Sequence, residues 1–188
     1  MHRMDIHTEQ QITALIEADA WMMNLLRVVK NLKLPDWWIC AGFVRSKVWD
    51  TLHNYEARTP LADIDVIYFD PTCLDEEMEK RIEQKLFAIR SDIPWSVKNQ
   101  ARMHEVNNLP PYKSATDGIA NFPETVTALG VKLEGDKLIL TAPHGVDDVL
   151  QMHVRPIPRF NASSDLKAIY ERRMMNKNWK AIWPKVDV

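Results

Sequence analysis

Two aspartates separated by one residue, Asp63 and Asp65, are the side chains of this sequence best suited to chemistry. The segment Ile64–Phe69 is rich in β-branched and aromatic residues, which predicts a buried strand. Residues two apart on a strand point to the same face, so the two carboxylates are expected to project together. Such a pair repels itself unless a cation lies between, and Mg²⁺ (or Mn²⁺) binds one or two carboxylates together with substrate phosphates. Asp63 and Asp65 therefore predict a divalent metal site.

Gly42, about twenty residues earlier, is the second candidate for chemistry. Trp37–Ala41 is typical of a short buried strand and Phe43–Leu52 has a helical pattern, so Gly42 is expected at a sharp strand-to-helix turn. Backbone N–H groups and the helix dipole can bind a phosphate there, and Arg45, one turn into the helix, can add a charge-assisted contact. A phosphate site beside a divalent metal indicates an in-line displacement in which pyrophosphate is the leaving group.

The elements that must position these residues can be predicted from periodicity and from turn residues. We expect a helix over residues 8–31, a helix after Asp75 with the buried stripe Met78, Ile82, Leu86 and Ile89, a third strand at Trp95–Lys98, a hairpin of Val131–Leu133 with Leu138–Leu140, and a helix over residues 165–175. The expected fold is α+β (α/β), a mixed sheet flanked by helices. We predict one domain over residues 1–188, with a core at about 37–155, the N-terminal helix 8–31, and a C-terminal helix and basic tail at 165–188.

The composition narrows the function classes. The chain has 188 residues, with 24 basic against 26 acidic side chains, so no overall positive charge favours binding to nucleic acid or to anionic membranes. Cys40 and Cys73 form no closely spaced pair, which argues against a zinc site or a disulfide framework. With no uninterrupted apolar stretch at the start, we expect a cytoplasmic protein without membrane spans.

The turn Ala41–Arg45 followed by Asp63-Ile64-Asp65 resembles the signature of the polymerase β-type nucleotidyltransferase superfamily, and it is particularly similar to the motif of CCA-adding enzymes. Further blocks resemble a bacterial family of small nucleotidyltransferase-like proteins, from about Trp38 to Pro184. These blocks are Ala41–Arg45, Trp49-Asp50, Asp63–Asp70, Pro94–His104, Pro143–Asp148 and Trp179–Pro184. Together they are specific, whereas either motif alone would be weak.

The resemblance implies roles for individual residues. Asp63 and Asp65 would be catalytic and would bind the metal. The nucleoside triphosphate, ATP among the possibilities, would be held by Gly42, Phe43, Arg45, Lys98, Asn99 and Arg102. Phe43 departs from the superfamily, which has Gly or Ser there, and this predicts a differently shaped phosphate contact. A third carboxylate is missing from its usual place; Asp147 and Asp148 are preferred for it over Asp92 and Glu105.

The predicted function is metal-dependent transfer of a nucleoside monophosphate from a triphosphate to a small-molecule or protein acceptor, with release of pyrophosphate. Nucleic acid is not expected as a partner. The alternatives are a catalytically inactive module that binds a nucleotide or a partner, and an interaction protein of toxin–antitoxin type. The tail bases Arg172, Arg173, Lys177 and Lys180 are interpreted as a solvated face, and Trp179 with Trp183 as anchors of the tail.

Overall fold

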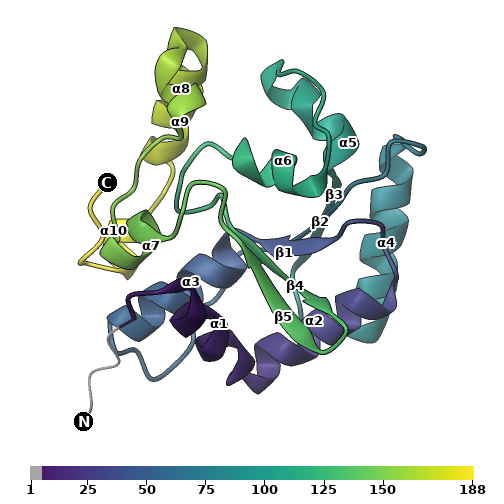
Figure 1. Ribbon diagram of the computed structural model, residues 1–188, viewed down its shortest axis with the longest axis horizontal. Helices are drawn as coiled ribbons and strands as arrows, with labels where there is room; N and C mark the ends of the chain where they lie inside the picture. The colour runs from purple at the N-terminus through teal and green to yellow at the C-terminus, as the bar shows by residue number, and fades with distance from the viewer. Residues whose placement is uncertain (1–5) are drawn as a thin grey trace.

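The computed structural model describes residues 6–188, and within them five strands form one mixed sheet (Figure 1). The strands are β1 (Trp38–Cys40), β2 (Ile64–Tyr68), β3 (Trp95–Asn99), β4 (Gly130–Glu134) and β5 (Lys137–Thr141). Their order is β3-β2-β1-β4-β5; β2 and β3 are parallel, and the other neighbours are antiparallel. The predicted third strand and the predicted hairpin are both present.

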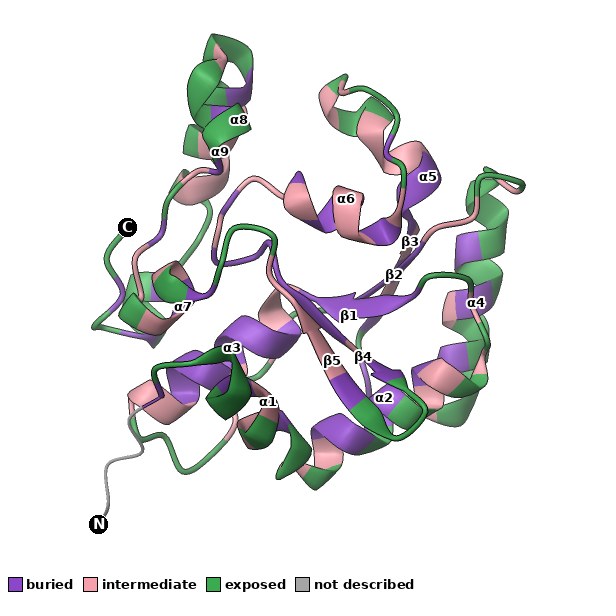
Figure 2. Cartoon of the chain, in the orientation of Figure 1, coloured by how far each residue is buried: buried purple, intermediate pink, exposed green. Residues whose placement is uncertain are grey.

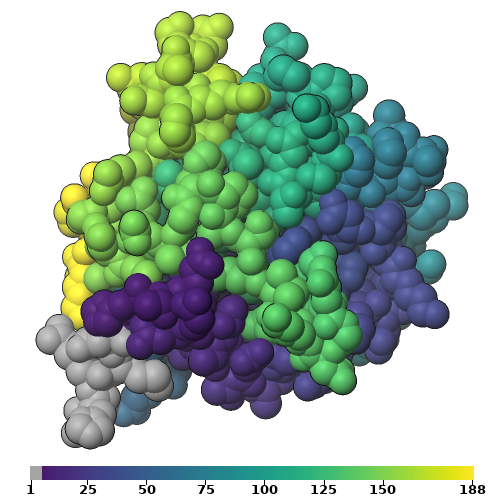
Figure 3. Space-filling model, viewed as in Figure 1, coloured from purple at the N-terminus to yellow at the C-terminus, as the bar shows by residue number. Residues whose placement is uncertain are grey.

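Helices cover both faces of the sheet (Figure 1). Those on one side are α1 (Glu9–Glu17), α2 (Ala20–Asn31), α3 (Gly42–Leu52) and α4 (Glu76–Ile89). The helices that come after β3 in the sequence are α5 (Gln100–Met103), the 3-10 helix η1 (His104–Asn107), α6 (Ala115–Ala120), α7 (Asp147–Gln151), α8 (Pro158–Ala162), α9 (Ser164–Met175) and α10 (Trp179–Ile182). On the surface shown in Figure 3, α1 lies against the hairpin strand β5.

Alternation along the strands separates two cores (Figure 2). Ile39, Val66 and Val97 belong to the larger core, which packs on α1 to α4. Cys40 and Ile67 belong to the smaller core on the opposite face, with residues of α6, α8 and α9. Asp65 lies between Ile64 and Val66, so its carboxylate is on the face of the smaller core, as the strand pattern predicts.

The helix predicted over residues 8–31 is broken in two. α1 ends at Glu17, and α2 begins after Asp19, whose side chain accepts a hydrogen bond from the Met22 N–H. The same carboxylate forms ion pairs with Lys47 at 2.8 Å and with Arg58 at 2.6 Å. Because an N-cap aspartate satisfies the free N–H groups of a new helix, Asp19 starts α2 instead of interrupting one long helix.

The buried stripe predicted for α4 is only partly correct. Ile82 and Leu86 are buried, but Met78 and Ile89 are 37% and 53% exposed. The place of an apolar side chain is taken by Glu79, which is 1% exposed and forms an ion pair with Arg102 from α5. A charge can occupy a buried helix position when it is paired in this way, and hydrophobic periodicity does not reveal it.

The C-terminal segment is anchored by two tryptophans, as predicted. The rings of Trp179 and Trp183 pack edge-on against Trp49 of α3, with centroids at 5.6 and 5.2 Å. Trp183 also donates a hydrogen bond to the buried carboxylate of Asp50 at 2.8 Å. The final turn of the chain is therefore packed onto the helix that follows β1.

The α+β class and the mixed sheet flanked by helices are confirmed. Across residues 6–188, no helix is both long and apolar enough to span a membrane.

Candidate functional site

A cavity of about 410 Å³ opens on the face of the sheet that carries Asp65. Its floor is formed at the edge of β1 and β2, and its walls come from the segment between β3 and β4 and from the C-terminal helix α9. The lining residues are Ala41, Gly42, Arg45, Asp63, Asp65, Ile67, Lys98, Gln100, Met103, Val106, Asn107, Tyr112, Asn121, Phe122, Pro123, Thr127, Ile169, Arg173 and Lys177. The cavity thus brings together the two sequence motifs, which lie about twenty residues apart, with the end of the chain.

Asp63 and Asp65 both line this cavity. Asp63 is exposed at the entry to β2 and Asp65 is half-buried within it. The pKa of Asp65 is raised to about 6, first by burial and second by the charge of Asp63, while the neighbouring Ser96 hydroxyl and the cations Lys177 and Arg45 act in the opposite direction. A raised pKa means that the surroundings of Asp65 disfavour its ionised form in the free protein.

The strand-to-helix turn has its sharp backbone angle at Ala41, one residue before the predicted position. Ala41 has φ 54° and ψ −118°, whereas Gly42 is the first residue of α3. Within the described part of the chain, no side chain caps the N-terminus of α3, and a Cβ added to Gly42 would approach the Arg45 guanidinium no closer than 3.4 Å. The first N–H groups of α3 are thus available to an anion in the cavity.

Arg45 is a nearly buried cation without a carboxylate partner. It is 8% exposed, and its Nε has no hydrogen-bond partner among residues 6–188. Its guanidinium carbon lies over the rings of Trp179 at 4.4 Å and Trp49 at 5.2 Å. Burial lowers the pKa of Arg45 to about 10, so it still carries its charge at neutral pH. An unpaired buried cation beside a free helix N-terminus is suited to a phosphate group.

Two further cations come from the C-terminal segment, and these were not predicted as part of the site. The Lys177 ammonium lies over the Trp179 ring at 5.2 Å, and its pKa is lowered by partial burial and by Arg173 and Arg45 nearby. Arg173 binds the fully buried Glu124 through two hydrogen bonds of 2.7 and 3.2 Å. The sequence offered no periodic signal for this pair, because Arg173 lies in the last turn of α9 and Lys177 lies beyond the end of that helix at Met175.

Of the four other residues predicted to hold the triphosphate, Lys98 lines the cavity, whereas Phe43, Asn99 and Arg102 do not. Phe43 is 1% exposed, and its ring packs in the larger core near Trp21 at 6.1 Å, so only its backbone N–H is on the side of the turn. Asn99 has its amide committed to the Asp70 backbone, to the Cys73 carbonyl and to the Ala101 N–H. The structure therefore does not bring the side chains of Phe43 and Asn99 to the cavity.

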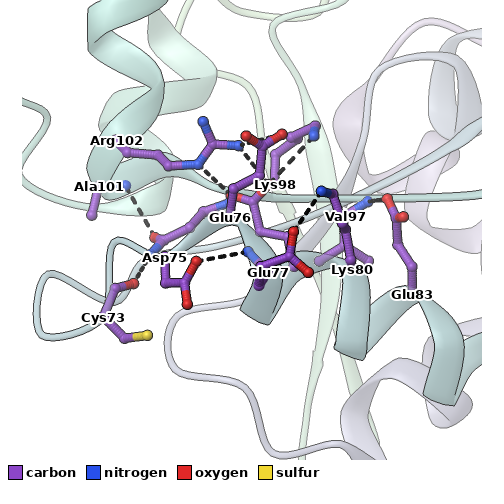
Figure 4. A network of polar contacts seen from close by, with 12 residues as sticks. Cys73, Asp75, Glu76, Glu77, Lys80, Glu83, Val97, Lys98, Ala101 and Arg102 are labelled. Carbon is purple, nitrogen blue, oxygen red and sulfur yellow. Dashed lines mark hydrogen bonds and ion pairs between the residues drawn. The ribbon is translucent and has the colours of Figure 1, made fainter.

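Figure 4 shows Arg102 and Lys98 within one network of polar contacts. Both form an ion pair with the buried Glu79. Arg102 donates two hydrogen bonds to it at 2.7 and 2.6 Å, and it is not among the residues that line the cavity. Burial would raise the pKa of Glu79, but the bonds from Arg102 and from the Asn99 N–H leave it below its usual range. Lys98, whose Nζ lies 3.3 Å from Glu79 Oε2, is the member of this pair that lines the cavity.

None of the candidates for a third carboxylate lines the cavity with Asp63 and Asp65. Asp148 accepts a hydrogen bond from Thr125 and pairs with Arg155, Asp147 lines a separate small hollow, and Asp92 pairs with Arg90. Glu105 lies on η1 and is exposed. Throughout the described residues, no cluster of three or more acidic, histidine or cysteine side chains could hold a metal. On β3, the residues in register with Asp65 and Ile67 are Ser96 and Lys98.

Asp63 and Asp65 nevertheless fit a divalent cation of the hard type. Both are oxygen donors, both face the cavity, and the pKa of Asp65 is raised in part by the negative charge of Asp63. A cation shared by the two would remove that repulsion, and magnesium needs no more than one or two carboxylates when phosphates and waters complete its shell.

Comparisons with known proteins identify the family and the fold of this chain. A sequence model for a family described as nucleotidyltransferase matches residues 27–188. A solved structure, described as an NMR structure that reveals a CCA-adding enzyme head domain, is 32% identical to this chain; the match covers 96% of this chain and 95% of the other, with a TM-score of 0.86. A search of curated proteins gave no match. From its sequence, its fold and the residues gathered in the cavity, this chain belongs to the nucleotidyltransferase family.

Proposed function

We propose that this protein transfers a nucleoside monophosphate from a nucleoside triphosphate to a small-molecule or protein acceptor, with magnesium or manganese as the metal and ATP among the substrates. The observation that carries the proposal is the presence of unpaired cations and a pair of acids in one cavity. Arg45 and Lys177 have no carboxylate partner within 4 Å among residues 6–188, and both lie in the cavity that contains Asp63 and Asp65. A metal-bound triphosphate would complement both sets of charges. Its phosphates would bind the two cations, and its metal ion would bind the two aspartates.

Each of these groups has a role in the reaction. Arg45, Lys177 and the first N–H groups of α3 bind the phosphates that leave as pyrophosphate, while Asp63 and Asp65 hold the metal. When bound, the metal supplies Lewis acidity at the phosphate and at the attacking oxygen. An acceptor hydroxyl oxygen bonds to the α-phosphorus as the bond to the bridging oxygen of pyrophosphate breaks. Pyrophosphate takes the electron pair, and the hydroxyl proton passes to solvent.

A second function is favoured by one observation. On β3, the side chains next to the acidic pair are Ser96 and Lys98 and not a carboxylate. A site with two acids and a lysine could bind a nucleotide without turning it over. This catalytically inactive binding module predicts stabilisation of the fold by a triphosphate and no release of pyrophosphate.

Asp65→Asn separates the two functions. The amide keeps the size of the side chain but loses the charge that holds the metal, so we expect pyrophosphate release from each triphosphate to fall by a factor of about a thousand with no decrease in the melting temperature. Asp136→Asn, in the exposed turn of the β4–β5 hairpin, is the matched control and should leave the rate unchanged. Equal turnover in Asp65→Asn and the unaltered protein would refute the assigned role.

We further propose that residues 1–188 act as one domain and that the protein works in a reducing compartment, the cytoplasm. The first is supported by a core that includes both Ile6 and Val186. The second is supported by the two cysteines of the chain, Cys40 and Cys73, which are both free thiols.

A further inference from the structure

The cavity has two chemically different ends. Toward α3 and the C-terminal segment the lining includes the charged residues Arg45, Asp63, Asp65, Arg173 and Lys177, whereas the lining residues from Gln100 to Phe122 are all uncharged; Lys98 on β3 is the charged residue next to this second group. Met103, Tyr112 and Phe122 supply apolar surface, and Gln100 and Asn121 supply the amides. A nucleotide has the same division, because its phosphates are charged and its base has flat apolar faces with a polar edge.

Gln100 is the most unusual residue of the apolar end. It is 2% exposed, yet among residues 6–188 no hydrogen bond joins its side-chain amide to another group. Buried amides are nearly always hydrogen-bonded, so such an exception needs an explanation. The amide is not sealed in the interior like the Nε of Arg45, and Gln100 lines the cavity, so its oxygen and nitrogen can be reached from there.

The position of Gln100 depends on a glycine of α6. A Cβ added to Gly118 would lie 2.5 Å from the Gln100 Oε1 and 2.9 Å from its Cγ. Any other residue at position 118 would therefore displace the amide. Asn121, at the end of the same helix, donates a hydrogen bond from Nδ2 to the Asp117 carbonyl at 2.8 Å, which fixes this second amide at the cavity wall.

We propose that Gln100, held in place by Gly118, binds the edge of the nucleobase and makes the cavity selective for adenine. The proposal rests on the proposed function, since it assigns a role in binding the triphosphate substrate. An amide offers one acceptor beside one donor. Of the two base edges that lie away from the ribose, adenine offers the complementary pair on both, through N6–H with N1 on the Watson–Crick edge and N6–H with N7 on the Hoogsteen edge, whereas the other bases offer it on the Watson–Crick edge alone.

The test compares binding of ATP, GTP, CTP, UTP and inorganic tripolyphosphate to the full chain, by calorimetry with magnesium present. In the unaltered protein, ATP should bind about tenfold more tightly than the other three triphosphates. Gln100→Leu should remove this preference and leave the affinity for tripolyphosphate unchanged. Gly118→Ala should weaken the preference in the same direction, because it displaces the amide without altering a residue of the cavity wall.

Two controls keep the result interpretable. Gln84→Leu, on the exposed side of α4, should change neither the preference nor the affinity. Gln100→Glu keeps the size of the side chain but replaces the donor by a second acceptor, so it should lose the preference for ATP even if the leucine variant fails to fold.

Three outcomes would overturn the proposal. These are equal affinity for the four triphosphates in the unaltered protein, preference for a base other than adenine, and a preference that survives in Gln100→Glu. In each of them tripolyphosphate would still bind, and the proposed function would stand. If neither tripolyphosphate nor any triphosphate binds, the proposed function itself fails.

Discussion

At the scale of single residues, the phosphate end of the cavity is organised by an aromatic ring. Trp179 lies beneath the guanidinium of Arg45 and also beside the ammonium of Lys177. A cation over an indole face is stabilised by the electron density of the ring, and it remains free to donate hydrogen bonds from its edge. The ring thus holds two positive groups near each other without neutralising either of them.

The contribution of Lys177 can be measured directly. Lys177→Met keeps much of the aliphatic stem and removes the charge, so we expect the KM for the triphosphate to rise about tenfold because one charge-assisted contact is lost. Lys180→Met, three residues later on the exposed side of the tail, is the control and should leave the KM unchanged. Steady-state kinetics at constant ionic strength checks this; a KM that rises equally in both variants would contradict a specific contact.

The pKa of Asp65 makes stability depend on pH. Its folded-state pKa is about 6 against a reference of 3.8, so between these values the folded protein binds more protons than the unfolded chain. The stability that this group contributes is fully present below pH 3.8 and is lost as the pH rises through 6. Asp65→Asn has no such loss. Relative to the unaltered protein, its free energy of unfolding should therefore improve from pH 4 to pH 7, by up to about 3 kcal/mol.

Urea unfolding at several pH values without divalent ions measures this difference. Asp136→Asn, in the exposed hairpin turn, should differ from the unaltered protein by the same amount at every pH. A constant difference for Asp65→Asn as well would show that the pKa of Asp65 is not raised.

Residue types and local spacing reveal only part of the site. Asp63, Asp65, Gly42 and Arg45 can be predicted because their positions depend on one strand and one turn. Lys177 cannot be, because its approach depends on packing between segments more than a hundred residues apart. Residue type and spacing also predict three residues near the phosphates that lie elsewhere. The polar groups of Asn99 and Arg102 are bonded to other parts of the protein, and the ring of Phe43 packs in the larger core.

At the scale of elements, the turn between β1 and α3 is under backbone strain. An alanine at φ 54° and ψ −118° is in a region that side chains other than glycine disfavour, at a cost of about 1–3 kcal/mol. The neighbouring Gly42 has an ordinary negative φ. Sequence pattern correctly places the turn, but it assigns the strain to the glycine, because glycine is the usual residue there.

The strain at Ala41 predicts an unusual substitution. Ala41→Gly should raise the free energy of unfolding by about 1 kcal/mol, since relief of strain exceeds the entropy that glycine adds to the unfolded chain. Ala88→Gly, in an exposed and regular part of α4, is the matched control and should lower it by about 1 kcal/mol. Urea unfolding of both variants provides the comparison, and a loss of stability in Ala41→Gly would contradict the strained geometry.

At the scale of the whole molecule, the net charge is −2, and four cations line the cavity, Arg45, Lys98, Arg173 and Lys177. Arg45 is buried, Arg173 is paired with Glu124 and Lys98 with Glu79. Binding of RNA depends on many exposed cations that contact successive phosphates. The fold class and the strand that carries the acids can be predicted from sequence, but the placement of these four cations around one cavity requires the tertiary structure.

Transfer RNA is therefore not expected to bind at physiological ionic strength. In an electrophoretic mobility assay at about 0.15 M salt, the chain should produce no shift of tRNA, and any shift in very dilute salt should disappear as salt is added. A complex that persists at about 0.15 M salt would make RNA the acceptor to consider first.

The bond between Trp183 and Asp50 joins residues 133 positions apart and fastens the last turn of the chain to the helix that carries Arg45. On the ribosome, α3 emerges long before its tryptophan partners have been made. The ring beneath Arg45 is made more than a hundred residues after α3. The stacking of Arg45 on Trp179 therefore cannot form until residue 179 has been synthesised.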